Sequence, residues 1–226
     1  MIIFYILGIL FVVLGMIFSG VLKRKFRKYS EIPLKGGLTG KDIAERMLRE
    51  NGINDVQVIS VGGQLTDHYN PVNKTINLSD GVFNSSSIAA AAVAAHECGH
   101  AVQHATNYAW IRMRSTLAPV VGISSKYVMW VILAGVLVAN SIGTTLLLVG
   151  IILFAAMTLF SFITLPVEID ASNRAIRWLQ GSSVAGTMEM GKARDALNWA
   201  CYTYIAAALG SLATLLYYIS IYLGML

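Results

Sequence analysis

Four long apolar runs constrain the fold of this chain more than any other feature of its sequence. They cover residues 1–22, two stretches within 119–165 (119–139 and 144–165), and 198–223. Because an α-helix rises about 1.5 Å per residue, each run can cross a hydrocarbon core of roughly 30 Å. Only 13% of the 226 residues are charged, against about a quarter in soluble domains. We therefore predict a mainly α-helical integral membrane protein with four transmembrane helices.

The basic residues predict how these helices are oriented. A cluster follows the first run directly and consists of Lys23, Arg24, Lys25, Arg27 and Lys28. The turn at 140–143 and the C-terminal tip carry no basic residue. Because basic segments are retained in the cytosol, we predict a multi-pass protein of the cytoplasmic membrane with both termini outside. Residues 23–118 and 166–197 are then cytosolic.

The charge distribution argues against a nucleic-acid-binding protein, and the cysteine content argues against a disulfide-stapled domain. The net charge is +5, but the basic residues form no extended stripe with interleaved aromatic residues, so no nucleic-acid partner is expected. Cys98 and Cys201 are far apart and lie in unlike contexts. Small disulfide-stapled domains carry several regularly spaced cysteines, so we predict that both are free thiols.

The first cytosolic segment, 23–118, predicts a small α+β domain. Thr39 followed by Asp42 is typical of a helix start, and Asn51-Gly52 predicts the end of that helix. Short apolar-rich segments bounded by turn residues predict strands, the last two forming a hairpin across a loop. The predicted strands lie at 56–61, 65–69 and 74–78, and the loop lies at 70–73.

An alanine-rich helix is predicted over about 88–105, and it carries the residues with the clearest chemistry. The serines at 85–87 offer its N-cap. Within it, His96-Glu97-Cys98-Gly99-His100 matches the pattern H-E-x-x-H. Two histidines four residues apart share one helical face, about 6 Å apart along the axis, and can bind one Zn²⁺ ion. Glu97 beside them predicts a base that takes a proton from zinc-activated water.

The alternative interpretation is a pair of histidines on a helix surface without a metal. It is disfavoured because the helix is strongly predicted and its surroundings are nearly uncharged. Gly99 also permits close approach of a neighbouring backbone. Cys98 points away from the histidine face and is a poor ligand candidate. Two imidazoles and a carboxylate suit zinc better than cobalt or manganese.

A catalytic zinc needs a third protein ligand and one open coordination position. We predict Glu168, because it follows the third apolar run on the same predicted side of the membrane as His96 and His100. Asp170 is an alternative, either as the ligand or as a group that orients a ligating histidine. His104 lies about 6 Å beyond His100 along the helix axis and is expected to lie outside the ligand set.

The sequence leaves the oxyanion-stabilising group open. His68, Tyr69 and Arg174 are candidates, although each is more consistent with packing or with solvated surface. The strand at 74–78, if it lies at a sheet edge, would accept an extended peptide by strand addition.

Three segments resemble one family of bacterial membrane proteins. They are LTDHYNPVNKTINLSDGVF, AAVAAHECGHAVQHA and LPVEIDASNRA. They are similar to the YugP-type neutral zinc metallopeptidases, and the resemblance covers essentially the whole chain. It implies a zincin-like membrane protease with His96, His100 and a downstream carboxylate as ligands and Glu97 as catalytic base. More distantly, the layout is similar to the HtpX and CAAX prenyl protease group, whose glutamate and aspartate are spaced E-x-x-x-D instead of Glu168-x-Asp170.

We therefore expect a zinc metallopeptidase that cleaves membrane proteins or membrane-associated peptides at the cytosolic face. Two alternatives stay open: an intramembrane-cleaving metalloprotease and a non-catalytic zinc-stabilised membrane adaptor. The apolar lead-in at 88–95 is too short to cross a bilayer, which disfavours the first alternative. Glu97 disfavours the second, because a structural zinc site has no use for a base. The sequence indicates no particular oligomeric state.

Overall fold

The computed structural model describes residues 2–138, 141–182, 184 and 186–225. The chain divides into two compact units that alternate along the sequence. The first, called here the apolar unit, consists of Met1–Ile17, Arg112–Pro166 and Tyr202–Leu226. The second, called the α+β unit, consists of Phe18–Ile111 and Val167–Cys201.

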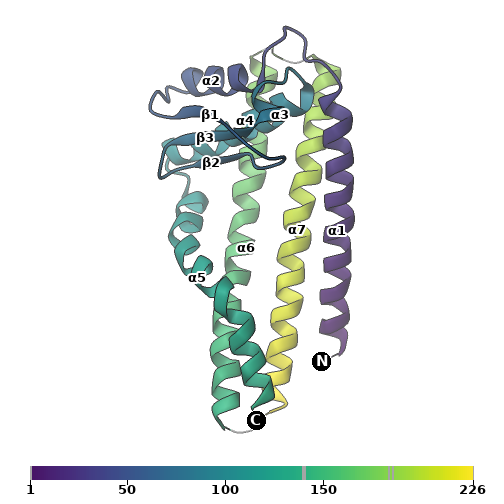
Figure 1. Cartoon of the computed structure of the whole chain (residues 1–226), viewed down its shortest axis with the longest axis vertical. Coiled ribbons are helices and arrows are strands. Elements are labelled where there is room, and N and C mark those ends of the chain that lie inside the picture. Colours follow the sequence, from purple (N-terminus) through teal and green to yellow (C-terminus); the bar gives the residue numbers. More distant parts are fainter. Residues whose placement is uncertain (1, 139–140, 183, 185, 226) are drawn as a thin grey trace. The chain divides into compact units, whose positions relative to one another are not determined.

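Within the described residues, four helices are long and apolar enough to cross a membrane. They are α1 (Ile2–Ser30), α5 (Ala109–Leu137), α6 (Ser141–Gly181) and α7 (Thr187–Leu223) (Figure 1). Their number and order agree with the predicted class, a mainly helical membrane protein. Residue 139, the last of the second predicted run, and residue 140, the first of the predicted turn at 140–143, lie outside the described residues.

All four of these helices extend beyond the apolar runs that predicted them, and α5 begins at Ala109 instead of at residue 119. α1 continues through the basic cluster to its end at Ser30, and α7 begins at Thr187 instead of near residue 198. α6 continues through Pro166, the expected exit of the third span. A proline inside a helix removes one backbone hydrogen bond, but apolar helices tolerate this where neighbouring groups support the backbone. Glu168 therefore lies inside a long helix, not at a helix start.

A three-stranded sheet forms in the α+β unit. Its strands are β1 (Gln57–Val61), β2 (His68–Asn70) and β3 (Thr75–Ser79), in the order β1-β3-β2. β3 pairs in parallel with β1 and antiparallel with β2, which confirms the predicted hairpin. The hypothesis that the strand at 74–78 lies at an edge is wrong, because β3 is paired on both sides. The edges of the sheet are β1 and β2.

Two capped helices, α2 (Gly40–Glu50) and α4 (Ile88–Ala105), pack in the same unit, which also contains the short helix α3 (Asp80–Phe83). Thr39 and Asp42 form a reciprocal capping box at the predicted start of α2. The hydrogen bonds that Thr39 donates, from its hydroxyl and then from its backbone N–H, hold the pKa of Asp42 below its ordinary value. The Ser87 hydroxyl caps α4 by accepting the N–H of Ala90.

The core of the α+β unit involves α2, the sheet and α4 (Figure 1). Ile43 and Met47 of α2 and Ile76 and Leu78 of β3 are at most 1% exposed. α4 contributes a series of buried alanines, namely Ala89, Ala90, Ala91, Ala92, Ala94, Ala95 and Ala101. Their small side chains let neighbouring elements pack directly against the helix backbone. The alanine-rich sequence of α4 therefore lets several neighbouring elements pack against this helix.

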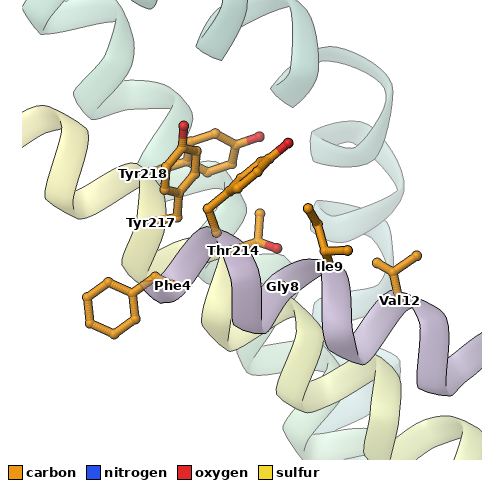
Figure 2. A pocket seen from close by; sticks show the side chains of 8 residues that line it. Phe4, Gly8, Ile9, Val12, Thr214, Tyr217 and Tyr218 are labelled. Atoms are coloured by element: carbon orange, nitrogen blue, oxygen red, sulfur yellow. The ribbon is translucent and has the colours of Figure 1, made fainter. Parts of the chain in front are cut away.

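In the apolar unit, α1 packs beside α7 at small residues (Figure 2). A Cβ atom at Gly8 would lie 3.4 Å from Thr214 Oγ1, and one at Gly210 would lie 3.2 Å from Phe11 Cβ. A hollow of about 250 Å³ beside this contact is lined by apolar and aromatic side chains, including Tyr217. Small residues at helix contacts are typical of helices that associate in lipid.

Candidate metal centre

Three side chains converge inside the α+β unit. His96 and His100 project from α4 and Glu168 from α6, and one donor atom from each lies within 4.8 Å of the others. Nε2 of His96 lies 3.2 Å from Oε2 of Glu168, and Nε2 of His100 lies 3.7 Å from the same oxygen. The three side chains are 13%, 9% and 3% exposed, respectively. Two imidazole nitrogens and a carboxylate oxygen therefore lie close together in a site that is largely shielded from solvent.

This donor set fits a zinc ion. Zinc binds imidazole nitrogen and carboxylate oxygen at about 2.0–2.2 Å, so two donors of one tetrahedral ion lie roughly 3.4 Å apart. The separations of 3.2 and 3.7 Å found here bracket that value. Three protein ligands also leave a fourth position for water or substrate, as catalytic zinc sites require.

Gly99 lets the two helices that carry the ligands approach closely. A Cβ atom at this position would lie 2.6 Å from the carbonyl oxygen of Ala171 and 3.0 Å from its Cα. Both contacts are with backbone, which cannot rotate away as a side chain can. The structure confirms that Gly99 permits a close approach, and it identifies the neighbour as α6, the helix that also supplies Glu168.

Glu97 lies beside the two histidines on α4 and is held in one orientation. It is 8% exposed, and its Oε2 accepts a hydrogen bond of 2.9 Å from the backbone N–H of Tyr69. Tyr69 belongs to β2, an edge strand of the sheet. A backbone donor in a sheet is fixed in position, so the sheet orients the carboxylate. Sequence reasoning missed this link, because it depends on tertiary packing between β2 and α4.

The ring nitrogens that face away from Glu168 are also hydrogen-bonded. Nδ1 of His96 lies 3.1 Å from Oγ of Ser172, and Nδ1 of His100 lies 3.0 Å from Oε1 of Gln103. Such partners orient a ligating imidazole and are part of most metal sites. Both were missed from the sequence. Ser172 stands four residues after Glu168, where the E-x-x-x-D pattern has its aspartate, and Gln103 follows His100 by one helical turn.

Asp170 and His104 lie outside the three converging side chains. Oδ2 of Asp170 accepts hydrogen bonds from Nε2 of Gln103 at 2.9 Å and from Nε of Arg174 at 2.6 Å. Asp170 therefore contacts a partner of a histidine and not the histidine itself. The ring of His104 packs against the ring of Tyr69, with 5.5 Å between the two ring centroids, as expected for a residue outside the ligand set.

The two cysteines and His68 also lie outside the converging group of His96, His100 and Glu168. Cys98 is fully buried, its thiol lies 3.5 Å from the carbonyl oxygen of Ala44, and burial raises its pKa well above the ordinary value. The thiol therefore stays protonated, and it lies on the side of α4 that faces α2. Cys98 and Cys201 are both free, as predicted. His68 is exposed and its Nδ1 contacts the carbonyl oxygen of Thr66.

Comparison with known proteins places the chain among its relatives. Residues 4–223 match the family model described as "Putative neutral zinc metallopeptidase". The chain belongs to this family. It is also 41% identical over 204 residues to "Putative membrane protease YugP" of Bacillus subtilis (strain 168), an alignment that covers 89% of this chain and 88% of the relative. No solved structure matches the chain.

Membership of the zinc metallopeptidase family confirms the resemblance inferred from the sequence. It also confirms the predicted cofactor, Zn²⁺. The donor set described above supports the same metal on independent grounds, because its chemistry and its spacing suit zinc. The similarity to a membrane protease agrees with the four apolar helices.

Proposed function

We propose that this chain is a membrane zinc metalloendopeptidase that hydrolyses peptide bonds of membrane or membrane-associated proteins at the cytosolic face. The observation that carries the proposal is the convergence of His96, His100 and Glu168, with Glu97 held in place beside them. Family membership supports the peptidase chemistry. The four apolar helices support the membrane setting.

In the proposed mechanism, three side chains hold the metal ion and a fourth transfers protons. His96, His100 and Glu168 would hold the zinc ion, which when bound polarises the scissile carbonyl and lowers the pKa of water to about 7. Glu97 accepts a proton from the attacking water and delivers it to the departing amine. The backbone N–H of Tyr69 orients Glu97 for both transfers by holding one of its carboxylate oxygens.

The position of Glu168 along α6 supports membrane-associated substrates. The apolar part of α6 ends near residue 165, and Glu168 lies only about 5 Å further along the helix axis. A peptide bond cleaved at this site must therefore come close to the bilayer surface. Proteins already held in or on the membrane meet this requirement most readily.

The cytosolic location is proposed from the charges of the α+β unit. This unit contains the basic cluster of α1, in which Lys23, Arg24, Arg27 and Lys28 are exposed. Basic segments next to membrane spans are retained in the cytosol. We therefore place the α+β unit in the cytosol and both chain termini on the opposite side of the membrane.

Removal of zinc is expected to abolish proteolysis reversibly. Treatment of the detergent-purified protein with 1,10-phenanthroline should stop cleavage of a detergent-solubilised mixture of membrane proteins, and stoichiometric zinc should restore it. The non-chelating isomer 1,7-phenanthroline is the matched control and should have no effect. New N-termini counted by mass spectrometry give the readout. Undiminished cleavage by the zinc-free protein would exclude the proposed chemistry.

The proposed orientation is tested by a pair of cysteine variants in a Cys201→Ser background. Ala105→Cys lies at the exposed end of α4 and Met225→Cys at the exposed C-terminal end. A membrane-impermeant maleimide should label Met225→Cys in intact cells and Ala105→Cys only in inverted vesicles. Labelling of Ala105→Cys in intact cells would reverse the orientation. Its protection on both sides would favour the intramembrane-cleaving alternative.

A further inference from the structure

Gln103 is the most completely buried polar side chain near the metal centre. It is 0% exposed, yet each of its polar atoms has a partner. Its Oε1 lies 3.0 Å from Nδ1 of His100, and its Nε2 lies 2.8 Å from the carbonyl oxygen of Val167 and 2.9 Å from Oδ2 of Asp170. One side chain of α4 therefore connects a proposed zinc ligand to the backbone and to a carboxylate of α6.

These partners determine which way the amide of Gln103 faces. The NH2 group of an amide only donates hydrogen bonds and its oxygen only accepts them. Val167 offers a carbonyl oxygen and Asp170 a carboxylate, and both of these only accept. The NH2 group must therefore face α6, which leaves the amide oxygen toward Nδ1 of His100.

The orientation of the amide in turn determines where His100 carries its proton. An oxygen that only accepts requires a hydrogen on Nδ1, and the neutral imidazole then has its lone pair on Nε2. Nε2 is the atom that faces Glu168, at 3.7 Å from Oε2. We propose that Gln103 is a positioning residue that fixes His100 in the tautomer and ring orientation needed to bind zinc.

The far end of this connection is anchored by charge. Asp170 also accepts a hydrogen bond of 2.6 Å from Nε of Arg174, one helical turn further along α6. The resulting chain of contacts runs from Arg174 through Asp170 and Gln103 to His100. His96 is held differently, because the Ser172 hydroxyl next to its Nδ1 can donate or accept. The two histidines are thus unequal, with the tautomer fixed only at His100.

The inference rests on the proposed metal site, and its test measures zinc binding without any substrate. Gln103→Met has a similar length but lacks the hydrogen bonds, and it should weaken zinc binding by the full-length detergent-purified protein about 10- to 100-fold. The absorption spectrum of its Co²⁺-substituted form should differ from that of wild type. Gln180→Met, on the exposed surface of α6, is the matched control and should bind zinc like wild type.

Two further variants separate positioning from simple packing. Gln103→Glu still accepts from His100 but cannot donate to Val167 or Asp170, so it should also bind zinc more weakly than wild type. A protein in which Gln103 only had to accept would bind zinc at least as tightly with this substitution. Asp170→Asn, which keeps its shape and lies partly at the surface, should weaken binding several-fold, and it tests the connection even if the Gln103 variants fail to fold.

A His100→Ala background distinguishes failure of this inference from failure of the site. If Gln103 acts through His100, then Gln103→Met should change the residual zinc affinity of that background by less than about two-fold. Equal weakening in both backgrounds, or wild-type affinity in Gln103→Met, would overturn the positioning role. Unchanged zinc binding in His100→Ala alone would instead overturn the metal site itself.

Discussion

Replacing Glu168 with alanine is expected to remove zinc from the purified protein and to abolish cleavage. The variant leaves two imidazoles to hold the ion, because Asp170 is already bound to Gln103 and Arg174. Loss of a residue that only orients a ligand weakens metal binding about 10- to 100-fold, so loss of the ligand itself should exceed that range. Zinc per chain, measured by atomic absorption after gel filtration, reports the effect.

The matched control for this experiment is Glu31→Ala. Glu31 is an exposed glutamate just beyond α1, and its replacement should leave one zinc per chain. Circular dichroism should show unchanged helix content in both variants, since alanine is a good helix former. Full zinc occupancy in Glu168→Ala would show that Glu168 is not a ligand. Loss of zinc from Asp170→Ala alone would transfer the assignment to Asp170.

Gly99→Ala is expected to disrupt the metal centre although it adds a single methyl group. The new Cβ would stand 2.6 Å from the carbonyl oxygen of Ala171, so α4 and α6 would have to separate. The same separation would pull Glu168 away from His96 and His100. We expect a loss of about 3 kcal/mol in stability, at the upper end for overpacked cores, together with loss of zinc. Thermal unfolding and zinc content measure the two effects.

Gly191→Ala provides the comparison for this variant. Gly191 also lies inside a helix, α7, but nothing lies within 4 Å of a Cβ atom built there. Alanine at such a position should be neutral or stabilise the helix by up to about 1 kcal/mol. If Gly99→Ala matched Gly191→Ala in melting temperature and zinc content, the close approach of α4 and α6 would not control the site.

The parts of the fold that the sequence predicted are those set by local chemistry. The long apolar runs predicted four apolar helices, and alanine content with a serine cap predicted α4 at 88–105. Thr39 and Asp42 predicted the start of α2, because a capping box involves only residues three apart. The trio His96, His100 and Glu168 was also predicted, since the histidine spacing is helical and the charge pattern placed Glu168 on the same side.

The features that sequence reasoning missed depend on contacts between distant segments. The strand at 74–78 was a candidate edge strand of the sheet, but β1 pairs with β3 in parallel. No local sequence pattern indicates that a strand has a parallel neighbour. Pro166 was expected at the exit of the third span, but α6 continues through it to Gly181. The partners of the histidines, Gln103 and Ser172, became visible only once α4 and α6 were packed together.

In the proposed function, zinc-dependent peptide hydrolysis uses Glu97 as the base. The most direct test compares detergent-purified wild type with Glu97→Gln for bound zinc and for cleavage of solubilised membrane proteins. We predict one zinc per chain in both proteins and cleavage about 100- to 10,000-fold slower in the variant, the usual contribution of a general base. Equal cleavage by the two zinc-loaded proteins would contradict the account and favour a non-catalytic zinc-stabilised membrane adaptor.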